Sequence, residues 1–187
     1  TYTGGTTISA GTLSLGNGGN NGSIVGNVAN SGILTFNRSV NATYAGIVSG
    51  TGAVTKSGTN TMTLTGANSY DGTTTISVGS LNLQNATGLG STAGGTSVTS
   101  GAALQLQGGI TVGAEALTLN GTGVSSTGAL LNVSGDNTYG GAITRGADTT
   151  IGSTAGTLTL SGTNGGNFST TFTGSGNITS SGVISST

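Results

Sequence analysis

Between residues 50 and 83 the chain reads GTGAVTKSGTNTMTLTGANSYDGTTTISVGSLNL. Apolar residues alternate with threonine or asparagine at Met62/Leu64 and at Leu81/Leu83, and glycine and asparagine separate these short alternations. Such alternation is typical of half-buried strands, and glycine and asparagine suit tight turns. The stretch therefore predicts short strands joined by sharp corners.

The same phrases recur elsewhere in the chain. Residues 1–15, TYTGGTTISAGTLSL, match residues 69–83, SYDGTTTISVGSLNL, without a gap. The segment around residues 64–72 recurs around residues 133–141, and residues 160–164 begin the phrase again. The predicted repeat corners are Asn68, Tyr70, Gly72, Asn137, Tyr139 and Gly141.

The alternating pairs recur about every 21 residues. A unit of this size that buries its apolar side only against its neighbours is a solenoid coil, and short strands with glycine corners predict a parallel β-helix. We expect one all-β unit over residues 1–187, with about eight or nine coils, no substantial helix and a length of about 40 Å. The predicted inner ladder consists of Leu13, Leu15, Leu34, Phe36, Met62, Leu64, Leu81, Leu83, Leu104, Leu106, Leu131, Val133, Leu158 and Leu160.

The composition excludes several classes of function. The chain has 39 Gly, no Pro, Cys or His, and three cations against four carboxylates. Three scattered cations do not make a nucleic-acid footprint, and cysteine–histidine zinc sites and histidine catalysis are impossible. No apolar run reaches the length of a membrane-spanning helix. We therefore predict no cofactor, no metal, no nucleic acid and no membrane insertion by this segment.

Few residues could carry chemistry. Asp136 and Asp148 are the nearest carboxylates in sequence, and Asp71 could share a corner with Asp136, but aspartate is a common solvent-exposed turn residue. The loop at residues 16–22, GNGGNNG, has the glycines of a calcium loop but no carboxylate. The repeated tyrosines, Tyr2, Tyr70 and Tyr139, could stack on sugars if exposed, whereas their repetition favours packing. We predict no catalytic residue.

Residues 50–83 closely resemble the passenger-associated repeat of bacterial autotransporters. Residues 1–15 resemble the second half of that repeat, and residues 85–187 are a degenerate match in which Ser180 stands at the position of Lys56. The resemblance implies a right-handed β-helix exported by a Gram-negative cell and displayed outside the outer membrane. It does not imply a particular ligand. Because the repeat pattern runs to both ends without a charged or irregular cap, we expect either a fragment of a longer passenger or coils that stack end to end between molecules.

The leading functional hypothesis is a non-enzymatic adhesive stalk that makes many weak polar contacts, in adhesion, self-association or biofilm. Its partners would be further copies, side by side or end to end, surface glycans, or host and matrix proteins. The alternatives are a glycan-processing β-helical enzyme, a protomer of an end-to-end stacked fibre, and an ice-binding solenoid. Paired threonines invite the last idea, at Thr61/Thr63, Thr73/Thr75 and Thr157/Thr159.

Overall fold

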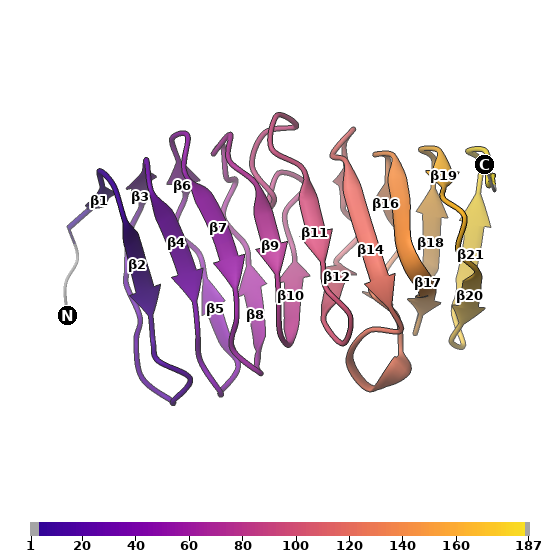
Figure 1. The fold of residues 1–187 in the computed structure, drawn as a ribbon, viewed down its shortest axis with the longest axis horizontal. Helices are drawn as coiled ribbons and strands as arrows, with labels where there is room; N and C mark the ends of the chain where they lie inside the picture. Colours follow the sequence, from indigo (N-terminus) through magenta and orange to yellow (C-terminus); the bar gives the residue numbers. More distant parts are fainter. Residues whose placement is uncertain (1–3, 186–187) are drawn as a thin grey trace.

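The computed structural model describes residues 4–185 and is a β-solenoid of about eight turns (Figure 1). All strand pairs are parallel, and the helical content of the described residues is one 3₁₀ turn, Val124–Ser126. β1 (Thr6–Ile8) lies at one end of the rod and β21 (Asn177–Ser180) at the other. The predicted parallel β-helix with no substantial helix is confirmed. No helix in residues 4–185 is long and apolar enough to span a membrane.

The strands lie on three faces of the rod, although not every coil contributes a strand to each face. Face 1 contains β2 (Thr12–Leu15), β4 (Ile33–Phe36), β7 (Ala53–Lys56), β9 (Thr74–Ile76), β11 (Thr96–Val98), β14 (Leu117–Gly121), the first part of β17 (Ile143–Ser153) and β19 (Asn164–Gly165). Face 2 contains β5 (Ala42–Tyr44), β8 (Thr61–Leu64), β10 (Ser80–Leu83), β12 (Ala103–Gln107), β15 (Leu130–Ser134), the last part of β17 and β20 (Thr170–Thr173). Face 3 contains two sheets, β1, β3 (Val28–Asn30) and β6 (Val48–Ser49), followed by β13 (Thr111–Val112), β16 (Asn137–Tyr139), β18 (Thr157–Leu160) and β21.

The register between neighbouring coils agrees with the predicted period. Paired residues are 19 apart at Thr61 and Ser80, 20 apart at Val54 and Thr74, and 27 apart at Thr111 and Thr138. The longest spacings between paired residues occur where residues 122–128 leave the sheet as a loop that contains the 3₁₀ turn. Insertions therefore sit at corners, and the stacked strands stay in register.

The eleven-residue strand β17 takes part in two faces. It pairs with β14 on face 1 and with β15 on face 2, so the chain passes this corner without leaving the strand. Faces 1 and 2 are thereby joined into one 14-stranded sheet.

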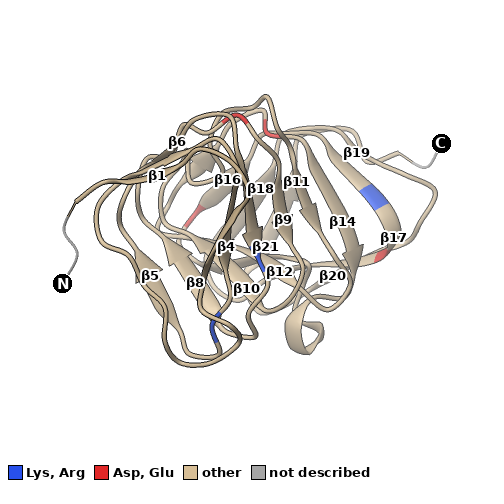
Figure 2. Ribbon diagram, turned by 60° about the vertical axis from the view of Figure 1, so that its left-hand side comes forward, with Lys and Arg blue, Asp and Glu red and all other residues tan. Residues whose placement is uncertain are grey.

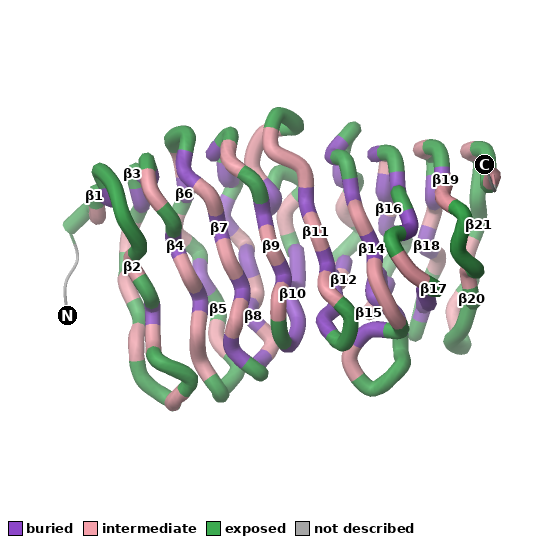
Figure 3. Tube along the Cα trace, viewed as in Figure 1, coloured by how far each residue is buried: buried purple, intermediate pink, exposed green. Residues whose placement is uncertain are grey.

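The core is a narrow apolar column inside the three faces (Figure 3). The leucines predicted as one inner ladder lie on different faces: Leu13, Leu15 and Leu34 on face 1, Leu81 and Leu104 on face 2, and Leu158 and Leu160 on face 3. All the predicted ladder residues are buried except Leu13, which is partly buried against the core, and Val133. The core therefore consists of parallel ladders, one set for each face.

One pair of the predicted ladder is wrong. Leu104 and Leu106 are in register with Leu130 and Asn132, so these two residues point inward, whereas Leu131 follows Gln105 on the outer side and Val133 is half-buried. The sequence LLNVS permits either alternation. The inward choice buries Asn132, whose amide nitrogen donates to Ala155 O at 2.8 Å and to Ser153 Oγ at 3.1 Å.

A second pair belongs to another face than its sequence phrase predicts. Leu158 and Leu160 pair with Asn137 and Tyr139 on face 3, not with the Leu131/Val133 strand on face 2. The cause is β17, which covers faces 1 and 2 before this phrase begins.

Candidate functional site

The repeat corners hold the coils together through buried asparagines. Asn68 Oδ1 accepts from Val48 N of the preceding coil at 2.8 Å, while Asn68 Nδ2 donates to Gly88 O of the following coil at 2.7 Å. Asn137 Oδ1 accepts from Ile110 N at 2.7 Å in the same way. Both side chains are buried, so the amides replace hydrogen bonds that water cannot supply there.

The repeated tyrosines are packing residues. Tyr70 and Tyr139 are fully buried, and Tyr2 lies outside the described residues. The Tyr70 hydroxyl lies 2.6 Å from Thr74 Oγ1, and the Tyr139 hydroxyl donates to Glu115 O at 2.9 Å. Burial raises the pKa of both phenols. Neither ring is available to stack on a sugar.

The corner glycines mark close approaches between coils. A Cβ on Gly72 would lie 2.3 Å from Gly52 O, and one on Gly141 would lie 1.7 Å from Glu115 O. Because real side chains do not approach backbone oxygen so closely, these corners require glycine.

Three of the seven charged residues are buried, and sequence reasoning did not find this. Lys56 donates to Gly58 O and to Val78 O, and burial lowers its pKa to about 8. Arg145 donates to Gly166 O and Ser185 O, at 2.7 and 2.6 Å. These two cations satisfy backbone carbonyls of their own and of following turns, so they have a structural role.

The third buried charge, Glu115, has one free oxygen. Its Oε1 accepts from Thr96 Oγ1 at 3.2 Å, whereas Oε2 is buried without a partner in the described chain. Burial raises the pKa of this carboxyl, and its bonds with Thr96 and Gly95 oppose that rise.

The three aspartates considered for catalysis lie apart: Asp71 precedes β9, Asp136 lies between β15 and β16, and Asp148 lies within β17. The acidic residues are red in Figure 2. Asp71 accepts from Ser91 Oγ at 2.7 Å, and Asp136 and Asp148 accept from Thr157 N and Ser169 N of the next coil at 2.9 and 2.8 Å. Within residues 4–185 no three acidic, histidine or cysteine residues group as metal ligands. The aspartates act as corner caps, which is the simpler of the two interpretations of the sequence.

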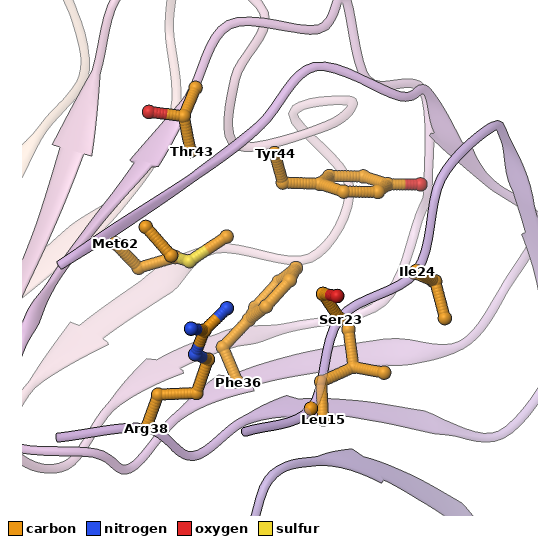
Figure 4. Close-up of a pocket in the computed structure, with 10 residues that line it drawn as sticks. Leu15, Ser23, Ile24, Phe36, Arg38, Thr43, Tyr44 and Met62 are labelled. Atoms are coloured by element: carbon orange, nitrogen blue, oxygen red, sulfur yellow. The ribbon is translucent and has the colours of Figure 1, made fainter. Parts of the chain in front are cut away.

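A small cavity lies where residues 16–27 replace a face 2 strand in the first coil (Figure 4). Its wall includes Leu15, Phe36, Arg38, Tyr44 and Met62, and its volume is about 20 Å³. This volume accommodates about one water molecule. The glycine loop at residues 16–22 therefore borders a water-sized space.

The outer side of face 1 carries a continuous row of hydroxyl groups. The strand registers stack one hydroxyl per coil over seven coils, at Ser14, Thr35, Thr55, Thr75, Ser97, Thr118 and Thr144. We call this row the face 1 ladder. Next to it, Thr73, Gly95, Ala116 and Thr118 line part of an open hollow of about 360 Å³.

The paired threonines that suggested ice binding do not form one surface. Thr61/Thr63 lie on face 2, Thr73/Thr75 on face 1 and Thr157/Thr159 on face 3. A regular two-row threonine array is therefore absent from the described coils.

The repeat geometry agrees with the comparison to known proteins. Residues 1–15 and 54–83 match the family described as Passenger-associated-transport-repeat. These two stretches are similar to the passenger-associated repeat. The chain is also 54% identical over 83 residues to the adhesin BmaC autotransporter of Brucella suis biovar 1 (strain 1330). That match covers 44% of this chain and 2% of the relative, so the chain spans a small part of the relative's length. No solved structure gives a significant match.

The passenger repeat explains which site residues sequence reasoning could find. Asn68, Tyr70 and Gly72 recur as Asn137, Tyr139 and Gly141, and repetition alone identified them. The face 1 ladder has no such signal, because threonine and serine are common throughout the chain and only the strand register shows which ones align.

Proposed function

We propose that this chain is a stalk segment of an autotransporter adhesin, exported by a Gram-negative cell and held outside its outer membrane. The observation that carries the proposal is the unbroken parallel stack of coils, in which two stretches match the passenger repeat and the outer side of face 1 aligns uncharged polar groups along the rod. The similarity to an autotransporter named as an adhesin supports the same role. The proposal assigns no catalytic step, because the exposed carboxylates cap separate corners.

The mechanism is extension with many weak contacts. A rod stiffened by inter-coil hydrogen bonds holds its outer groups in fixed positions, so a partner that binds one position finds the next one already in place. The low net charge, −1 at neutral pH, leaves little electrostatic repulsion toward a neutral partner.

Surface display tests this function. The chain would be placed between a signal peptide and an outer-membrane barrel in a non-adherent host, and cells that display the barrel alone would be the control. We expect protease added to intact cells to remove the segment, and we expect displaying cells to adhere to host-cell or matrix surfaces more than the control. Normal display without a gain in adhesion to any surface would refute the adhesive role.

A further inference from the structure

The hydroxyl groups of the face 1 ladder are almost all unused by the protein itself. Ser14 donates to Gly16 O at 2.7 Å, whereas the hydroxyls of the other six members make no hydrogen bond within residues 4–185. Neighbouring strands lie about 4.8 Å apart, so the seven hydroxyls span about 29 Å in a straight line. Six groups that can both donate and accept are thus presented at a regular spacing.

A second row of small side chains runs beside the ladder. Successive coils place Ile33, Ala53, Thr73, Gly95, Ala116 and Ala142 there. Gly94, Gly95 and Ala116 line the open hollow that Thr73, Thr75, Ser97 and Thr118 also border. Face 1 therefore has a row of mainly small residues beside the row of hydroxyls, with one open hollow where β9, β11 and β14 lie side by side.

Neither row contains a charged or aromatic side chain. Lys56 and Arg145 point into the core from face 1, and Asp71 lies at the adjoining corner, where it accepts from Ser91. Protein partners usually bind through a few buried tryptophan, tyrosine or arginine residues, and a charged polymer requires opposite charges. The surface instead fits a neutral partner with many hydroxyl groups.

We propose that face 1 binds an extended, uncharged polysaccharide whose chain runs along the rod axis. A pyranose ring has an apolar face of C–H groups and an edge of hydroxyls. The C–H faces lie over the row of small residues, the sugar hydroxyls exchange hydrogen bonds with the ladder, and the hollow at Gly95 takes one ring. This inference rests on the proposed adhesive function and names its ligand class.

The arrangement also explains how weak contacts give useful binding. One neutral hydrogen bond contributes little in water, because sugar and protein both give up bonds to solvent. A polymer that has bound one coil reaches the next at high effective concentration, so affinity increases with the number of coils engaged. We therefore expect long chains to bind and free monosaccharides to bind weakly.

The test uses two matched triple variants of the whole chain. The first, Thr55→Val, Thr75→Val and Ser97→Ala, removes three ladder hydroxyls. The second, Thr138→Val, Thr159→Val and Thr179→Val, removes three hydroxyls that are aligned in the same way on the outer side of face 3. Valine keeps the shape and strand preference of threonine, and circular dichroism and thermal unfolding check that both variants fold.

Binding is measured by affinity electrophoresis and calorimetry with dextran, mannan, xyloglucan and a linear β-1,3-glucan, and with heparin and alginate as charged probes. We expect the unmodified chain to bind at least one neutral polymer, with little dependence on salt. Each lost hydroxyl should weaken binding by about fivefold, so the face 1 variant should lose about a hundredfold. The face 3 variant should bind as the unmodified chain does.

Three results would overturn the assignment: no binding to any neutral polymer, tighter binding to the charged probes, or equal affinities of the two variants. These failures are separate from failure of the proposed function. Displaying cells that adhere while the purified chain ignores neutral polysaccharides would keep the adhesin and reject the face 1 site. If the purified chain binds a neutral polysaccharide through face 1 while displaying cells gain no adhesion, the face 1 site stands and the adhesive function is rejected.

Discussion

Replacing Asn68 with alanine tests how far the inter-coil amide bonds hold the rod together. The variant removes the acceptor of Val48 N and the donor to Gly88 O, whose bonds are 2.8 and 2.7 Å long and are both buried. Leaving one buried polar group unpaired costs about 1–3 kcal/mol. The two groups together should therefore lower the free energy of unfolding by about 2–6 kcal/mol.

The measurement is urea unfolding followed by circular dichroism, together with the thermal midpoint, which should fall by at least about 4 °C. Ser69→Ala is the matched control, because Ser69 is exposed and its side chain makes no hydrogen bond in the described chain. Its stability should stay within about 0.5 kcal/mol of the unmodified chain. A loss below about 1 kcal/mol for Asn68→Ala, or an equal loss in both variants, would refute the reasoning.

Three further variants test the corners and the buried charges. Gly72→Ala should lower the free energy of unfolding by more than about 2 kcal/mol, because the new Cβ would overlap Gly52 O. Gly113→Ala is the control in the same urea assay and should be neutral, because a Cβ at Gly113 meets no atom within 4 Å. Equal effects of the two substitutions would contradict the close approach at Gly72. Burial lowers the pKa of Lys56 from 10.5 to about 8, so between these two pH values the unfolded chain binds more protons at this side chain than the folded chain does. Stability should therefore rise by about 2 kcal/mol between pH 7 and 9.5, and Lys56→Met should abolish that rise; an unchanged slope would contradict it. Burial raises the pKa of Glu115, so its contribution to stability is full below pH 4.5 and is lost as pH rises through the folded-state pKa. Glu115→Gln should thus be relatively more stable at pH 8 than at pH 4 by urea unfolding, and the opposite ranking would count against the burial argument.

The fold could be predicted from the sequence because its signals are local and repeated. Alternation at Met62/Leu64 and Leu81/Leu83 marks strands, and recurrence of the Asn68 to Gly72 phrase marks coils. The face on which a strand lies is harder to predict from the sequence, because strands on all three faces show the same two-residue alternation. Leu158 and Leu160 illustrate this limit, since β17 passes a corner without a break and shifts the phrase by one face.

The inner polar residues could not be predicted for a different reason. Lys56, Asn132 and Arg145 are in the interior because backbone carbonyls of a neighbouring turn need donors there. Hydropathy alone places such residues outside. Only the three-dimensional stack shows which carbonyls lack a strand partner.

The direction of the inter-coil hydrogen bonds has a mechanical consequence. They lie along the rod axis, so a pull on the two ends puts the same tension on every coil, and the coils open one at a time. Each coil that opens replaces a rise of about 4.8 Å with about 70 Å of extended chain, since one coil holds about 21 residues. Under tension the rod would lengthen in steps at its weakest coil, while the remaining coils keep their shape.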